Sequence, residues 1–376
     1  MIAKAPSFTF GIEEEFHVVD RETRELAVAP KSMIRALEEH IGSQVSPEFL
    51  RSQIEIGTKP LTSFNDARHE LGRLRRVVVD VADRYGLALL ASGTHPFAQP
   101  GETETTDKER YKDLDRDLAG AIRGLAVCGM HVHAGIEDDD LRIDLMNQAR
   151  YFLPHLLTLS TSSPFWRGID TGLKSYRLTV MSRLPRSGLP GLFASWGEYQ
   201  RTLAVLINAG IIEDGSKIWW DLRPSARFPT LEMRICDVCP RIDDTMAIAA
   251  TYVCILRMLW RRKRSNLKWR TYPISLIEEN RWRAQRYGVS GTLLDLSIGA
   301  LVPFADLMEE LCELIAEDAL ALDCEREIAH LRNIAIGGTS ADRQLETWHR
   351  ALEDGGDERN AFLAVIDQLV AETAMP

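Results

Sequence analysis

Four apolar segments of this chain each carry a pair of polar side chains at alternate positions. The segments lie at residues 7–20, 50–57, 127–136 and 230–236. Polar and apolar residues that alternate with a period of two are typical of a β-strand, whose successive side chains point to opposite faces. Both members of a pair therefore lie on one face of a strand, and any fold of this chain must accommodate four such polar faces.

The four pairs combine acidic, amide, imidazole and guanidinium groups. They are Glu13 with Glu15, Gln53 with Glu55, His131 with His133, and Glu232 with Arg234, whereas Glu14 points away from its two neighbours. Burying an unpaired carboxylate costs several kcal/mol, so buried pairs need compensation, and divalent cations supply it most simply. Oxygen-rich ligand sets with an occasional imidazole suit Mg²⁺ or Mn²⁺ better than zinc.

A single pair of this kind is more often the solvated face of an antiparallel sheet. Two features favour a binding site here. The pairs recur with several chemical types, and glycines lie next to them at positions 11, 57, 129 and 135, where backbone or ligand can approach closely. The constellation therefore indicates a site, although each member alone does not.

Helical periodicity fills most of the remaining chain. We expect helices at residues 64–85, 141–159, 196–209, 244–264, 303–323 and 357–373, and a further buried strand at 87–94. Because helices separate the strands irregularly, this order favours an α+β fold with an antiparallel or mixed sheet over a doubly wound parallel sheet. No linker or repeat divides the chain, so we expect one domain spanning residues 1–376.

The charge and hydropathy of the sequence limit the kinds of partner that the protein can have. The 45 basic and 55 acidic residues give a net charge of −10, which disfavours a nucleic-acid partner. The longest apolar stretch, residues 246–260, contains Arg257 and is shorter than the roughly 20 residues of a membrane-spanning helix. The first residues lack the apolar core of a signal peptide. We therefore expect a cytoplasmic protein with no membrane partner.

Six cysteines are scattered over the chain and do not form a disulfide framework. Cys236 and Cys239 have the CxxC spacing, but no second pair lies near them. We therefore expect two small residues that close a strand, rather than a zinc or redox site.

Arginines form a second group of candidates. Arg223 and Arg227 precede the strand at 230–236, and Arg177 lies farther upstream. The guanidinium fork suits phosphate and carboxylate oxygens, although surface ion pairing is the common alternative. The sequence lacks a Walker loop, a dinucleotide fingerprint and a nucleophile elbow, so metals and arginines on a sheet would have to hold any nucleotide.

Tryptophans could line a pocket or fill the core. We expect Trp219 or Trp220 in the core, and Trp166, which lies near Pro164, at a rim.

Eight motifs resemble those of the bacterial carboxylate–amine ligases of the glutamate–cysteine ligase type 2 family, within the glutamine synthetase-like superfamily. They are GIEEEF at 11–16, SQIE at 52–55, SGTHP at 92–96, CGMHVH at 128–133, SSPFW at 162–166, FPTLEMRICDVC at 228–239, ENRWR at 279–283 and TSADRQ at 339–344. The resemblance runs from about residue 8 to about residue 350. It implies a curved, mainly antiparallel sheet with helices on its convex side, and a concave face that holds ATP and divalent metals.

The resemblance also implies roles for the paired residues. The expected metal ligands are Glu13, Glu15, Glu55, His131 and Glu232, with Glu48 as a further possible ligand. Arg234 would face the transferred phosphoryl group and, with Glu55 and Glu232, form the catalytic set. His133 would lie near the ATP phosphates, and Arg223, Arg227 and Arg177 would bind those phosphates or the substrate carboxylate.

The activity implied is ATP- and Mg²⁺-dependent amide formation through an acyl phosphate, with glutamate and cysteine giving γ-glutamylcysteine. The amine partner stays open, because no thiol-recognising pocket is evident in the sequence. A guanidino kinase on the same sheet and a non-enzymatic ligand-binding protein are the alternatives. The resemblance also favours a homodimer or higher assembly.

Overall fold

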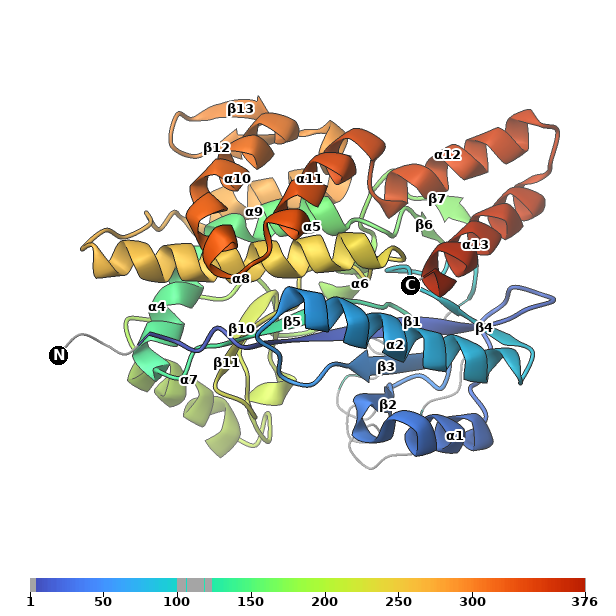
Figure 1. Ribbon diagram of the computed structural model, residues 1–376, viewed down its shortest axis with the longest axis horizontal. Helices are drawn as coiled ribbons and strands as arrows, with labels where there is room; N and C mark the ends of the chain where they lie inside the picture. The colour runs from blue at the N-terminus through green and yellow to red at the C-terminus, as the bar shows by residue number, and fades with distance from the viewer. Residues whose placement is uncertain (1–4, 100–105, 107–117, 119–123, 376) are drawn as a thin grey trace.

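The computed structural model describes residues 5–99, 106, 118 and 124–375 (Figure 1). Its centre is an antiparallel sheet in which the strand order is β10-β11-β5-β1-β3-β2, with β4 pairing on β1. The strands are β1 Phe10–Asp20, β2 Val45–Pro47, β3 Gln53–Gly57, β4 Leu87–Leu90, β5 Met130–Gly135, β10 Leu222–Pro224 and β11 Thr230–Met233. All four segments expected to carry polar pairs thus lie in one sheet.

The long strand β1 sets the register of the others. It pairs with β3 on one edge and with β5 on the other, and β4 continues the β5 edge from His17 to Asp20. This arrangement places Glu13 opposite His131, and Glu15 opposite Glu55. Residues from segments far apart in the sequence therefore become cross-strand neighbours on one face.

The opposite face of the sheet is covered by helices. Helix α2 (Phe64–Asp83) and helix α8 (Ile242–Arg264) pack there, and α8 is buried over most of its length. Glu14 points to this side, as expected, and is fully buried. Its oxygens accept two bonds from Arg75 of α2, at 2.8 Å from Nε and 2.5 Å from Nη2, and one from Thr245 of α8 at 2.8 Å. A charged pair therefore fastens the sheet to both helices.

The other helices form an outer layer around α8 and the ends of the sheet (Figure 1). They are α1 Lys31–Ile41, α4 Asp139–Ala149, α5 Leu153–Ser160, α6 Arg177–Met181, α7 Trp196–Asn208, α9 Ile274–Tyr287, α10 Phe304–Ala321, α11 Glu325–Gly337, α12 Ser340–Glu353 and α13 Glu358–Ala374. Small strand pairs are β6 Phe165–Trp166 with β7 Ile169–Asp170, β8 Ser187–Gly188 with β9 Trp219–Trp220, and β12 Thr292–Asp295 with β13 Ala300–Pro303. An antiparallel sheet backed by helices confirms the α+β expectation.

One of the expected helices is divided into two helices in the structure. Residues 141–159 form α4 and α5, joined by a 3₁₀ turn over Arg150–Phe152. Pro154 lies in the first turn of α5, where its missing N–H costs no hydrogen bond, so it marks a helix start. Across the described ranges, no helix combines the length and the apolarity that crossing a membrane demands.

Candidate active site

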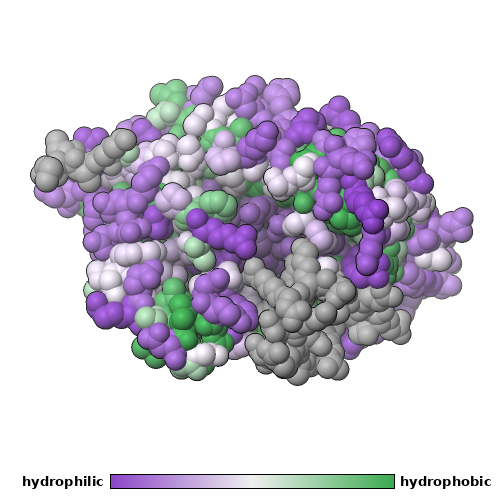
Figure 2. Space-filling model, turned by 90° about the horizontal axis from the view of Figure 1, so that it is seen from below, coloured by the Kyte–Doolittle hydropathy of each residue, from purple (hydrophilic) through white to green (hydrophobic). Residues whose placement is uncertain are grey.

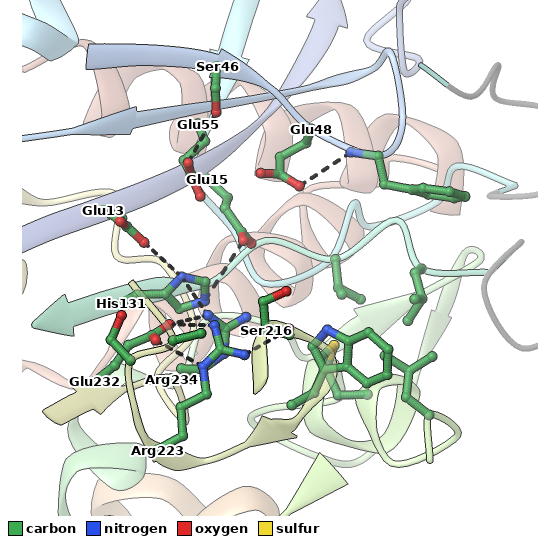
Figure 3. Close-up of a pocket in the computed structure, with 18 of the residues that line it drawn as sticks. Glu13, Glu15, Ser46, Glu48, Glu55, His131, Ser216, Arg223, Glu232 and Arg234 are labelled. Atoms are coloured by element: carbon green, nitrogen blue, oxygen red, sulfur yellow. Dashed lines mark hydrogen bonds and ion pairs between the residues drawn. The ribbon is translucent and has the colours of Figure 1, made fainter. Parts of the chain in front are cut away.

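The face of the sheet opposite helices α2 and α8 carries a row of facing acidic and imidazole side chains (Figure 3). His131 Nδ1 lies 3.4 Å from Glu13 Oε2, and His133 Nε2 lies 3.5 Å from Glu13 Oε1. His133 also shares a hydrogen bond of 2.8 Å with the Thr230 hydroxyl. Although burial opposes it, hydrogen bonds with His131 and then His133 hold the pKa of Glu13 well below its usual range. Glu13 is therefore ionised at neutral pH.

Carboxylates crowd together next to this row. Glu15 accepts a bond of 2.6 Å from the Gly129 N–H, and Glu55 accepts one of 3.1 Å from the Ser46 hydroxyl. Burial first, and then the charge of Glu48, raise the pKa of Glu15 to about 7. The same two causes raise the pKa of Glu55 well above its usual range. Neighbouring carboxylates with raised pKa values form a site that a cation would stabilise.

Two sets of ligand atoms lie close enough to hold cations, and they share one imidazole. Within the described ranges, Glu13, His131 and Glu232 form one set, and Glu15, Glu55 and His131 form the other, with the atoms of each set within 4.8 Å of one another. Buried His131 Nε2 has no hydrogen-bond partner in the described part of the chain. Burial, and then the charge of Arg234, lower the pKa of His131 to about 4, so its ring is neutral. The donor set fits Mg²⁺ or Mn²⁺.

Arginines adjoin this acidic group through Glu232. Arg223 binds it with Nε at 2.9 Å and Nη2 at 3.2 Å, and Arg234 donates Nη1 to the same carboxylate. Burial raises the pKa of Glu232, but the two arginines outweigh it and hold that pKa well below its usual range. Arg223 Nη1 also donates to the carbonyls of Ser216 and Ile218. Arg223 therefore orients Glu232, with most of its donors already occupied.

The other expected arginines differ in exposure. Arg227 is exposed on the loop between β10 and β11 and lines the mouth of the pocket with Phe228. Arg177 also lines the pocket, but its side chain is only 3% exposed and donates to the carbonyls of Arg234 and Ile235. The structure therefore brings every expected site residue to one pocket, although the arginines are not equally open to a ligand.

The pocket has a volume of about 550 Å³ and lies over the sheet face that carries the paired residues. Figure 2 shows hydrophilic side chains around a hollow near the middle of the face seen from below. Part of the lining is apolar, including Val127, Met181 and Trp219. Of the two tryptophans of which one was expected in the core, Trp220 packs partly buried against the main core, and Trp219 lines the pocket. The rim expectation for Trp166 is wrong, since it packs against Val127 and Val180 and is 8% exposed.

Asp237 was not among the predicted site residues, although it lies between the two cysteines of the CxxC motif. The flanking Cys236 and Cys239 are buried and reduced, and burial raises the pKa of each thiol. Neither joins a potential metal-ligand group within the described ranges. The polar centre of the motif is the fully buried Asp237. A lone acid between four apolar residues was the signal available.

Comparison with known proteins identifies the family. The model for "Glutamate-cysteine ligase family 2(GCS2)" matches residues 9–361. A protein of Rhodospirillum rubrum with the name "Putative glutamate--cysteine ligase 2" is 54% identical over 378 aligned residues, covering 99% of this chain and 97% of the relative. One of Jannaschia sp. with the same name is 51% identical over 365 residues, covering 97% and 96%.

A solved structure has the same fold at low sequence identity. The glutamate–cysteine ligase of Francisella tularensis, in complex with AMP, superposes with a TM-score of 0.71 at 15% identity, covering 99% of this chain and 90% of that one. This likeness confirms the expected fold. The family match over nearly the whole chain and the identity to full-length relatives lead to one conclusion: the protein belongs to glutamate–cysteine ligase family 2.

Proposed function

We propose that this protein is an ATP-dependent carboxylate–amine ligase that activates the γ-carboxyl group of glutamate. The observation that carries the proposal is the pairing, in one pocket, of two potential cation sets with the guanidinium of Arg234. Phosphoryl transfer to a carboxylate needs cations to neutralise charge and fixed donors for the phosphoryl oxygens. Both line the same pocket here.

The chemistry has two steps. A carboxylate oxygen attacks the γ-phosphorus of ATP, the bond to ADP breaks, and an acyl phosphate forms. An amine then attacks the acyl carbon, phosphate leaves, and the amine gives up a proton as the amide forms. The protein supplies positioning and charge neutralisation, and no covalent nucleophile is required.

The chain's own residues divide these tasks. Arg234 stabilises the charge on the transferred phosphoryl oxygens, and His133 lies toward the ATP phosphates. Arg227, which is exposed at the pocket mouth, binds a phosphate or the substrate carboxylate. Arg223 holds Glu232 in place.

Metal binding belongs to the same proposal. The residues that would hold Mg²⁺ or Mn²⁺ are Glu13, Glu15, Glu55, His131 and Glu232, with Glu48 as a further ligand. Bound there, the ions would neutralise phosphate charge and orient the nucleotide. Glu55 and Glu232 thereby belong to the catalytic set.

The names of the relatives support particular substrates. Glutamate and cysteine appear in them, and AMP appears with the Francisella tularensis enzyme. We therefore propose glutamate as the carboxylate and cysteine as the first amine to test. We propose further that residues 1–376 form one catalytic domain and that the protein assembles as a homodimer.

Phosphate release from ATP tests the proposal. Purified protein is assayed with Mg²⁺ and glutamate across a panel of amines that includes cysteine, and the product is identified by mass. We expect release that requires glutamate and increases with at least one amine, with the matching amide as product. Release that needs no carboxylate, or a phosphorylated guanidino product, would contradict the ligase assignment.

A further inference from the structure

A buried polar cluster lies directly behind the pocket and is centred on Asp237. Its carboxylate accepts bonds from the backbone N–H of Ser162 at 3.0 Å, the hydroxyl of Ser163 at 2.7 Å and the hydroxyl of Ser175 at 2.9 Å. All four residues are fully buried or nearly so. A buried charge with three donors in fixed positions has a defined orientation, because any rotation would leave donors and acceptors unsatisfied.

Arg177 is the cationic partner of this carboxylate. Its Nη1 lies 3.9 Å from Asp237 Oδ1, and its backbone N–H donates to the Ser163 hydroxyl at 3.1 Å. Two glycines make room for the pair. A Cβ on Gly129 would lie 2.2 Å from Arg177 Nη2, and a Cβ on Gly93 would lie 2.8 Å from the Asp237 carboxylate. Side chains at these positions would displace the pair, so glycine is required by close approach.

The same guanidinium of Arg177 also reaches the main chain that follows strand β11. It donates to the carbonyls of Arg234 and Ile235, both at 3.3 Å. These residues follow the end of β11 at Met233, where the chain leaves its ladder with β5. On its other side, this segment is held by the Arg234 N–H, which donates to the Asp221 carbonyl at 2.9 Å. Arg177 thus clamps the backbone at the residue whose side chain enters the pocket.

We propose that Asp237 and Arg177 are a positioning pair that holds Arg234 in its working orientation. The inference rests on the proposed function, in which Arg234 stabilises the transferred phosphoryl group. It departs from the expectation that Arg177 binds ATP or substrate directly, because Nη1 and Nη2 of its guanidinium donate to main-chain carbonyls, while the buried Nε has no partner among the described residues. Asp237 does not line the pocket, so any effect it has on catalysis must pass through other residues.

Steady-state kinetics of Asp237→Asn test whether Asp237 affects catalysis through the position of Arg234. Misplacing a catalytic group by about 1 Å costs about 100-fold in rate, so we expect kcat to fall about 10–100-fold with the KM values for ATP and glutamate within about threefold. Asp318→Asn is the matched control, because Asp318 is also fully buried and binds Arg257 and Arg261, between α8 and α10 and outside the pocket. The control should lose comparable stability and keep wild-type kcat.

A double-mutant cycle identifies the residue through which Asp237 acts. If the pair works through Arg234, then Asp237→Asn should lower kcat by less than about twofold in an Arg234→Ala background. Independent, multiplicative effects would overturn the proposal. So would a raised KM with an unchanged kcat, which would make Arg177 a substrate ligand.

A crystal structure of Asp237→Asn gives a readout that needs no turnover. We expect the Arg234 guanidinium to move away from Glu232 while the sheet keeps its register, and an unmoved guanidinium would overturn the inference. Ser175→Ala, which removes one bond to Asp237 Oδ1, is the milder variant if Asp237→Asn fails to fold. An inactive wild-type protein would contradict the proposed function alone, because the displacement of Arg234 is measured without substrates.

Discussion

Glu14 and Glu15 are adjacent on β1 but face opposite sides of the sheet, so the same substitution at each should have opposite consequences. Glu14→Gln removes the negative charge of a fully buried pair and leaves Arg75 charged without its counter-ion. Breaking a buried ion pair by removing one partner costs about 3–5 kcal/mol. With an unfolding entropy of about 2 cal/mol/K per residue, a chain of 376 residues then loses about 4–6 °C in melting temperature.

Glu15→Gln instead changes the charge repulsion among the carboxylates of the pocket. Its amide oxygen can still accept the bond from Gly129, while one negative charge leaves the group formed with Glu48 and Glu55. The metal-free variant should therefore be as stable as the wild-type protein or more stable. Because Glu15 is a proposed ligand, the stabilisation that Mg²⁺ provides should be lost.

Thermal unfolding at pH 8, with and without Mg²⁺, separates the two effects. We expect the wild-type protein and Glu14→Gln to show the same Mg²⁺-dependent increase from different starting temperatures, and Glu15→Gln to show little increase. A melting temperature of Glu14→Gln within about 1 °C of wild type would refute the energetic reasoning. An unchanged Mg²⁺ response in Glu15→Gln would remove this residue from the ligand set.

Three further predictions concern activity and pH. Glu232→Gln should lower kcat at least about 100-fold in the phosphate-release assay, whereas Glu309→Gln, in an exposed ion pair, should not, and retained activity in Glu232→Gln would contradict its role. Burial lowers the pKa of His17 from 6.5 to about 3 and that of His95 from 6.5 to about 4. As the pH falls, the unfolded chain therefore binds these protons first, so each histidine should lower the unfolding free energy by ~1.4 kcal/mol for every pH unit of acidification from pH 6.5 to 4. His17→Leu should show a smaller dependence of the unfolding free energy on pH in denaturant titrations. Arg227→Ala should reduce kcat/KM about tenfold without changing the melting temperature, since the side chain is exposed, and an unaffected kcat/KM would place Arg227 outside the binding site.

Period-two patterns predicted the polar face of the sheet because they are a local property of a strand. Glu13, Glu15 and His131 face one another for that reason, and Glu14 faces away. The register between strands depends on contacts between distant segments, so that Glu15 would lie opposite Glu55 could not be read from either segment alone. The family resemblance supplied the relation between the strands.

Three features of the structure were not predicted correctly, each for a physical reason. The break between α4 and α5 follows from Pro154, whose effect depends on where the helix starts. Trp166 was expected at a rim but is buried, because a tryptophan suits a pocket wall and a core equally well, and only the path of the chain decides. Asp237 was missed because its partners are serines from another segment, whose approach is a tertiary property.

The buried Glu14–Arg75 pair also governs the fidelity of folding. A one-residue slip of β1 would turn Glu13 and Glu15 toward the helices and carry Glu14 to the face that bears the pocket. Two unpaired carboxylates would then be buried, and Arg75 would lose its partner, so the misaligned sheet would be several kcal/mol less stable than the native one. The pair therefore selects one register of β1 in the sheet, and this register also places the site residues correctly on the other face.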